Sequence, residues 1–191
     1  MAHNSYFFDD SFAQSEQLPR EFTLYFKSID TPGMKAVQVF MNETVQLGDI
    51  IDDNSFKSDN YRFHDIFHYT FATLLGWSPC ARALIKCKRK SNFVIDKIED
   101  GARAAVTEEA ISVMIFNEAQ KRNFYHNNKS VSKYLLKIIK EITEPYEVRT
   151  RAESEWELAI LEGYKIFRKL VEHDGGRVYF NSYNKEIIYL N

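Results

Sequence analysis

A segment from about residue 96 or 99 to residue 121 carries apolar side chains in nearly every direction around a helix, and it constrains the fold most. Such a helix has to be covered on most sides. Glu108 and Glu109 nevertheless stand in its middle, and burying an unpaired carboxylate is costly. The sequence therefore predicts a buried helix in which Glu108 has a cation or a proton beside it. The apolar residues that define this helix are Ala104, Ala105, Val106, Ala110, Ile111, Val113, Met114, Ile115, Phe116 and Ala119.

Four further segments have helical patterns. In residues 61–75, apolar side chains recur at helical spacing, and Gly76 follows as a C-cap. The chain then turns at residues 77–79 into a short helix over residues 80–85. Two amphipathic helices are predicted over residues 131–142 and 153–171.

Two segments alternate between apolar and polar residues, as strands with one buried face do. Residues 22–41 alternate around a turn at residues 30–33, and residues 178–190 form a second alternating pair after Gly175 and Gly176. The predicted fold is mainly α, with a four-helix-bundle-like core and small N-terminal and C-terminal β-hairpins. Residues 1–20 are expected to form a loosely ordered lead-in, and residues 21–191 a single domain.

Composition excludes several classes of protein. The net charge of -2 disfavours nucleic acid as the main partner. No apolar run approaches the roughly 18 residues of a membrane span, so no membrane association is expected. Cys80 and Cys87 form neither a disulfide framework nor a zinc knuckle. We therefore expect two thiols in a reducing compartment and a cytoplasmic location.

A histidine pair lies on the first predicted core helix. His64 and His68 are four residues apart and therefore project from the same side of that helix, with Asp65 beside them. Both imidazoles are placed to face one ligand. The alternative is that both are hydrogen-bonded residues at the edge of the core.

Carboxylates on the apolar helix complete a candidate metal site. Glu108 and Glu109 lie mid-helix, while Glu99 and Asp100 lie near its start, where they also suit the helix dipole. Imidazoles and carboxylates together suit Mg²⁺, Mn²⁺, Ni²⁺ or Zn²⁺, and the mixture does not choose among them.

A basic run connects the two helices that carry these acids. Lys86, Lys88, Arg89 and Lys90 are placed to neutralise the charge of a polyphosphate beside a bound metal. The alternative is a solvated loop. Arg103 is either another phosphate contact or the partner of an ion pair within its helix.

These segments resemble a branch of the MazG-like all-α nucleoside triphosphate pyrophosphohydrolases. The resemblance implies a helical bundle, often oligomeric, that binds Mg²⁺ through carboxylates on two helices. It also implies cleavage of a nucleoside triphosphate between the α and β phosphates. The likeness extends from about Phe22 to the C-terminus, and it is carried by residues 61–68, 76–79, 88–91 and 99–103 and by Glu108-Glu109.

The chain departs from the usual metal motif of that family, which is Glu-Glu-x-x-Glu on one helix and Glu-x-x-Asp on the next. Ser112 stands where the third glutamate is expected, and no Glu-x-x-Asp occurs in the sequence. Glu108 and Glu109 carry over directly. The roles of His64, Asp65 and His68 rest on their spacing alone.

Together these patterns predict a divalent-metal site for nucleotide phosphate chemistry, and the resemblance implies that the chain is a nucleoside triphosphate pyrophosphohydrolase. Its cofactor is expected to be Mg²⁺ or Mn²⁺, or another divalent transition metal because of the histidine pair. Glu108, Glu109 and His64 are the candidate catalytic residues, a nucleotide is the expected substrate, and a homodimer is expected from the resemblance. Two alternatives stay open: an HD-type metal phosphohydrolase, suggested by the adjacent His64 and Asp65, and a non-catalytic nucleotide-binding or interaction module.

Overall fold

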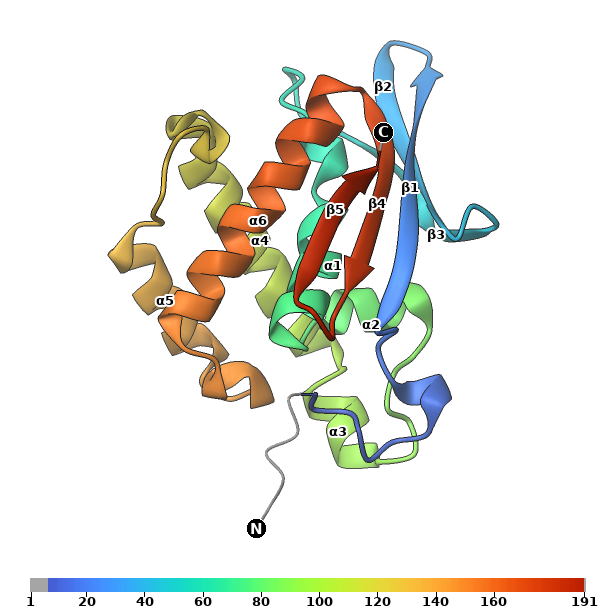
Figure 1. Cartoon of the computed structure of the whole chain (residues 1–191), viewed down its shortest axis with the longest axis vertical. Coiled ribbons are helices and arrows are strands. Elements are labelled where there is room, and N and C mark those ends of the chain that lie inside the picture. The colour runs from blue at the N-terminus through green and yellow to red at the C-terminus, as the bar shows by residue number, and fades with distance from the viewer. Residues whose placement is uncertain (1–6, 191) are drawn as a thin grey trace.

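One antiparallel sheet brings together the two ends of the domain (Figure 1). The computed structural model describes residues 7–190. The central strand pairs on one side with the strand that follows it and on the other with a strand near the C-terminus, in the order β3-β2-β1-β4-β5. The strands are β1 (Glu21–Thr31), β2 (Met34–Met41), β3 (Val45–Asp52), β4 (Gly175–Asn181) and β5 (Glu186–Leu190).

The alternating residues of β1 explain why this sheet forms. Phe22, Leu24 and Phe26 point to one face and are buried. In the register between β1 and β4, Phe22 lies opposite Phe180, and their rings stack with centroids 4.7 Å apart. Burying this face removes apolar area from water at roughly 25 cal/mol per Å², so the pairing of the two ends stabilises the fold.

The predicted fold class was therefore wrong. The chain does not form a mainly helical bundle with two small separate hairpins, because the hairpins pair with each other through β1 and β4. A lone two-stranded hairpin is marginally stable in water, and joining the two gives one wide apolar face. Strand β3 was missed because Leu47 is its one well-buried apolar residue, so the strand shows no alternation.

Six α-helices lie beside this sheet among the described residues (Figure 1). Helices α1 and α6 pack against each other and both contact β4 and β5, while α4 and α5 pack farther from the sheet. The helices are α1 (Asp65–Leu75), α2 (Pro79–Ile85), α3 (Phe93–Ile98), α4 (Ala102–Lys121), α5 (Lys133–Thr143) and α6 (Glu153–Glu172). Short 3₁₀ turns occur at Gln14–Glu16, Tyr61–Phe63, Asn123–Tyr125 and Glu147–Thr150. No helix of this described part is long and apolar enough to cross a membrane.

Helix α1 is buried along its whole length. Tyr69 packs against Phe180 of the sheet, and Phe67 packs against Tyr164 of α6. Gly163 permits the close approach of α6 to α1. The helix ends at Gly76, whose left-handed φ of 72° is the C-cap conformation that its position predicted.

The long apolar helix predicted from about residue 96 or 99 to 121 is two helices. A break at Asp100 and Gly101 separates α3 from α4, and a Cβ atom on Gly101 would lie 2.0 Å from the carbonyl oxygen of Lys97. Glu99 and Asp100 therefore lie in the break, outside the first turn of α4. Helix α4 is also less covered than predicted, because Val106 and Val113 are 67% and 44% exposed.

The predicted lead-in packs on the domain from residue 7 onwards, and residues 1–6 lie outside the described part. Asp9 is buried, and its carboxylate accepts hydrogen bonds from the guanidinium groups of Arg20 and Arg82. The segment is thereby held against α2.

The contact between α1 and α6 can be tested at Gly163. A Cβ atom there would lie 3.0 Å from Cδ1 of Phe67, so we expect Gly163→Val to destabilise the protein by about 1–3 kcal/mol through overpacking. Urea unfolding measures the change. Asn117→Val, at an exposed position of α4, is the control for the helix propensity of valine. Equal stability of the two variants would contradict the close packing of α1 on α6.

Candidate metal centre

The start of α1 positions three of the predicted site residues. The 3₁₀ turn Tyr61–Phe63 leads into His64, which is the N-cap of α1, and Asp65 is the first residue of the helix. His68 follows one turn later, and its ring centroid is 5.8 Å from that of His64. The predicted convergence of the two imidazoles is present in the structure.

The orientation of His64 is set by backbone. Its Nδ1 lies 2.9 Å from the carbonyl oxygen of Tyr61, and the ring of Tyr61 stacks on the imidazole at 4.2 Å. A carbonyl oxygen only accepts, so Nδ1 of His64 donates and carries a proton. In neutral His64 the lone pair is therefore on Nε2. This atom lies 3.4 Å from Oδ1 of Asp65.

The orientation of His68 is set by Glu108. Nδ1 of His68 lies 2.9 Å from Oε1 of Glu108, which is fully buried, as the sequence predicted. The hydroxyl of Ser78 donates to the same oxygen at 2.7 Å, and the backbone N–H of Cys80 donates to Oε2 at 2.9 Å. Both oxygens of Glu108 are thus occupied. Glu108 holds the imidazole in place and does not face the candidate ion.

The other nitrogen of His68 lacks a hydrogen bond. Nε2 is buried and has no hydrogen-bond partner among the described residues. Oε1 of Glu109 lies within ion-pair distance at 3.2 Å, but without hydrogen-bond alignment, and Oδ1 of Asp65 lies at 4.0 Å. A buried nitrogen without a partner is costly, and its surroundings are rich in oxygen.

Three residues form a group that fits a divalent ion. Ligand atoms of His64, Asp65 and His68 lie within 4.8 Å of one another. Donors about 2.0–2.2 Å from one ion are roughly 3–4 Å apart, which small side-chain rotations would reach. A second group of ligand atoms, from His68, Cys80 and Glu108, has the same spacing. It is the weaker candidate because the Glu108 oxygens are already hydrogen-bonded.

Neighbouring groups of this centre shift one another's pKa. Burial lowers the pKa of His64. Burial also acts to lower the pKa of His68, but the charge of Glu108 and hydrogen bonds raise it well above its usual value. Burial acts to raise the pKa of Glu109, but the nearby imidazole of His68 lowers it to about 2. A proton on His68 therefore occupies the position that a metal ion would take.

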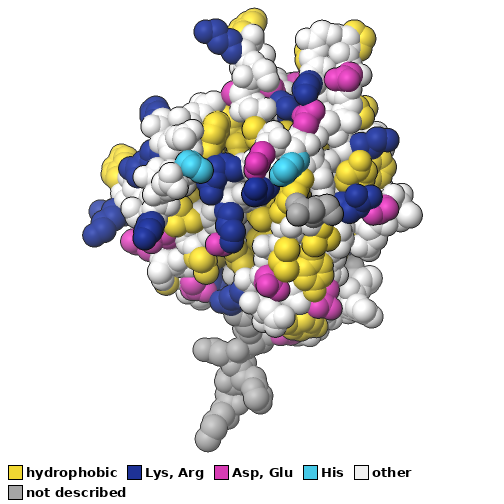
Figure 2. All heavy atoms as spheres, turned by 45° about the horizontal axis from the view of Figure 1, so that its top comes forward, with side chains coloured by type: hydrophobic (Ala, Val, Ile, Leu, Met, Phe, Trp, Pro, Cys, Tyr) yellow, Lys and Arg dark blue, Asp and Glu magenta, His cyan; other side chains and the backbone are white. Residues whose placement is uncertain are grey.

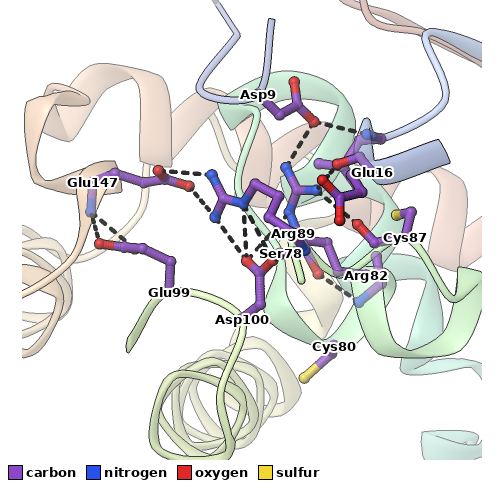
Figure 3. A network of polar contacts seen from close by, with 12 residues as sticks. Asp9, Glu16, Ser78, Cys80, Arg82, Cys87, Arg89, Glu99, Asp100 and Glu147 are labelled. Carbon is purple, nitrogen blue, oxygen red and sulfur yellow. Dashed lines mark hydrogen bonds and ion pairs between the residues drawn. The ribbon is translucent and has the colours of Figure 1, made fainter. Parts of the chain in front are cut away.

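Glu99, Asp100 and Arg89 belong to a different cluster (Figure 3). The Arg89 guanidinium pairs with Asp100 at 2.7 Å and with both oxygens of Glu147 at 2.8 and 2.9 Å. Glu99 accepts the backbone N–H of Glu147 at 3.1 Å. The structure therefore does not bring Glu99 and Asp100 to the metal group, and Arg89 is committed to carboxylates rather than available to a phosphate.

The remaining predicted phosphate contacts lie at the surface. Lys86 and Lys90 are exposed, Lys88 is half-buried, and Arg103 is exposed in the first turn of α4. Lys86 caps the C-terminal end of α2, whereas Cys80 at the other end contacts Glu108. The length of this helix, roughly 10 Å, separates the basic run from the Glu108 end of the centre.

Two residues that position the candidate centre were missed in the sequence. Ser78 and Cys80 both hold the Glu108 carboxylate. The pair Ser78-Pro79 does signal the N-terminus of a helix, and Ser78 is the N-cap of α2, accepting the N–H of Ala81. Nothing in that local signal shows that α4 packs against this cap.

One family model, described as the MazG C-terminal domain, matches residues 3–191. The match covers almost the whole chain. No curated protein and no solved structure matches it.

The cluster around Arg89 predicts a pH-dependent stability. Burial raises the pKa of Glu147 to about 7 despite its pairing with Arg89. A carboxyl whose pKa is higher in the folded state than in the unfolded chain makes stability fall as pH rises through the folded value. We therefore expect the stability of Glu147→Gln relative to wild type to rise as pH increases from about 4.5 to about 7, by at most about 1.4 kcal/mol per pH unit, and to level off above that value.

Urea midpoints at a series of pH values measure this difference. Glu141→Gln, at an exposed position of α5, is the control and should follow the wild type. Parallel curves for Glu147→Gln and wild type would show that the ionisation of Glu147 is not linked to folding.

Proposed function

Because the chain belongs to the MazG C-terminal domain family, we propose that it is a divalent-metal-dependent hydrolase of nucleotide phosphoanhydrides. The specific reaction proposed is conversion of a nucleoside triphosphate to the monophosphate and pyrophosphate. The cofactor proposed is a divalent ion, Mg²⁺, Mn²⁺ or a transition metal, bound by His64, Asp65 and His68.

A single observation carries this proposal. The Nδ1 atoms of His64 and His68 each face a fixed acceptor, and the Nε2 atoms of both rings approach Oδ1 of Asp65, at 3.4 and 4.0 Å. Two imidazoles and a carboxylate that converge in this way are a common ligand set of catalytic metals. A bound divalent ion would supply polarisation of a phosphoryl oxygen and a water of lowered pKa.

Glu109 is the proposed general base. Its side chain is 46% exposed, and its Oε1 lies 3.2 Å from Nε2 of His68. It therefore borders both the ligand group and solvent. A carboxylate in this position is able to orient the attacking water and accept its proton. Glu108, which has no exposure, acts through His68 as a positioning residue.

Phosphate binding is assigned to the free cations of the basic run. Lys86, Lys88 and Lys90 remain available, as does Arg103, whereas Arg89 is not. Neutralising the charge of the outgoing pyrophosphate would lower the barrier to cleavage.

A homodimer in the cytoplasm completes the proposal. Val106, Ala110 and Val113 form an exposed apolar stripe on α4, and exposed Phe93 and Val94 lie on the neighbouring α3. Pairing of two chains would remove such surface from water. The two free cysteines are compatible with a reducing compartment. On the face shown in Figure 2, basic and acidic side chains are interspersed, which does not favour nucleic acid as a partner.

The hydrolase is tested with a panel of nucleoside and deoxynucleoside triphosphates and Mg²⁺, Mn²⁺ or Zn²⁺. We expect monophosphate and pyrophosphate in equal amounts by ion-exchange chromatography. Glu109→Gln should lower kcat by about 10²–10⁴-fold, because it removes the general base and keeps the size of the side chain. Glu162→Gln, which disturbs a surface ion pair with Lys165, is the control and should keep full activity.

Absence of monophosphate with every nucleotide and ion would remove the proposed reaction. Full activity of Glu109→Gln would remove the role of Glu109 but not that of the ligand group.

A second candidate is an HD-type phosphohydrolase. It is favoured by one observation, that His64 and Asp65 are adjacent in sequence and both belong to the ligand group. Release of phosphate from phosphomonoesters or opening of cyclic nucleotides, without cleavage of triphosphates, would identify it. Nucleotide binding measured by calorimetry without turnover of any of these substrates would instead identify a binding module.

A further inference from the structure

We propose that the centre formed by His64, Asp65 and His68 selects a borderline transition-metal ion of the Zn²⁺ and Co²⁺ class over Mg²⁺. The inference rests on the proposed metal centre and names its ion. It does not depend on which phosphate bond is cleaved.

The donor atoms favour this class of ion. Nitrogen of imidazole suits Zn²⁺ and its neighbours, whereas Mg²⁺ prefers oxygen ligands and retained water. Two of the three side chains in the ligand group are histidines. Their Nε2 atoms are the ones left for a ligand, because Tyr61 and Glu108 occupy the Nδ1 atoms.

The acceptors behind the imidazoles add to this preference. A carboxylate that accepts the Nδ1 proton of a metal-binding histidine fixes the ring and makes Nε2 a better donor. Glu108 has this relation to His68, and its own position is fixed by Ser78 and Cys80. The carbonyl oxygen of Tyr61 accepts the Nδ1 proton of His64 and fixes that ring as well. A chain that bound its ion only through flexible surface carboxylates would not need these supports.

Burial disfavours Mg²⁺ further. The side chains of His68 and Asp65 are 1% and 9% exposed, and that of His64 is 14% exposed. An ion in this position has to give up most of its water. Mg²⁺ does so reluctantly and keeps several waters in most protein sites. Nε2 of His68 is buried and makes no hydrogen bond among the residues described, so a bound ion that accepts nitrogen ligands would give it a partner.

Calorimetry on the full chain, stripped of metal with a chelator, tests the selectivity. We expect one Zn²⁺ or Co²⁺ to bind about 10²-fold or more tightly than Mg²⁺ under the same conditions. The visible absorption of bound Co²⁺ provides an independent signal that the ion has left its octahedral shell of water. Equal affinity for Zn²⁺ and Mg²⁺ would overturn the inference.

Variants locate the bound ion. His64→Asn and His68→Asn should each remove high-affinity Zn²⁺ binding, and Glu108→Gln, which keeps an acceptor for Nδ1 without the charge, should weaken it by about 10–100-fold. His173→Asn, on an exposed histidine, is the matched control and should bind as wild type does. Unchanged Zn²⁺ affinity in both His64→Asn and His68→Asn would overturn the inference.

Nitrogen NMR of the wild type covers the case in which a variant does not fold. On addition of Zn²⁺, the Nε2 signals of His64 and His68 should change, while the Nδ1 signals keep the character of protonated nitrogen. Unchanged Nε2 signals with bound Zn²⁺ would place the ion elsewhere and contradict the inference.

The failures of the two proposals are distinguishable. Selective Zn²⁺ binding without turnover of any nucleotide supports this inference and removes the hydrolase. Turnover with Mg²⁺ in a chain that shows no preference for Zn²⁺ removes this inference and keeps the hydrolase.

Discussion

This structure depends on the hydrogen bonds that the buried carboxylate of Glu108 accepts. The carboxylate is buried inside the domain, and donors from two other segments close on it: the imidazole of His68 from α1, and Ser78 and the backbone of Cys80 at the start of α2. Removing any one donor leaves a buried charge partly unsatisfied, which is costly. The same bonds tie α1, α2 and α4 together and aim His68 at Asp65 and His64. Stability and the geometry of the candidate centre therefore have one origin.

The domain satisfies its buried charges in two different ways. Around Asp100 and Arg89, charged groups are paired with one another from the N-terminal segment to the 3₁₀ turn at Glu147 (Figure 3). The charged groups of that cluster already have partners within the chain, and their pairing stabilises the fold. Around His68, the carboxylates and imidazoles leave Nε2 without a hydrogen bond among the described residues. Polar groups that are all hydrogen-bonded or ion-paired without a ligand stabilise the fold. Where a buried polar atom lacks such a partner, a bound ligand contributes the most free energy.

The helical spacing of His64 and His68 was sufficient to predict that both imidazoles face one point, because residues four apart on a helix share a side. The apolar sequence around Glu108 was sufficient to predict its burial and its need for a companion. The predicted roles of Asp100 and Arg89 were not supported, for a common reason. The break at Gly101 turns Asp100 away from the first turn of α4 and places it beside Arg89.

The sequence by itself determined a helix that ends at Leu75, the two alternating segments, the histidine pair and the burial of Glu108, since each follows from local periodicity or from the cost of a buried charge; the helix begins at Asp65 rather than at residue 61. Only the tertiary structure decided that the two alternating segments form one sheet, because the pairing of β1 with β4 joins residues about 150 positions apart. The tertiary structure also decided which donor groups each buried carboxylate pairs with. Carboxylates are alike in sequence, and their function depends on the donors that packing brings to each oxygen: a guanidinium for Asp100, and an imidazole, a hydroxyl and a backbone N–H for Glu108.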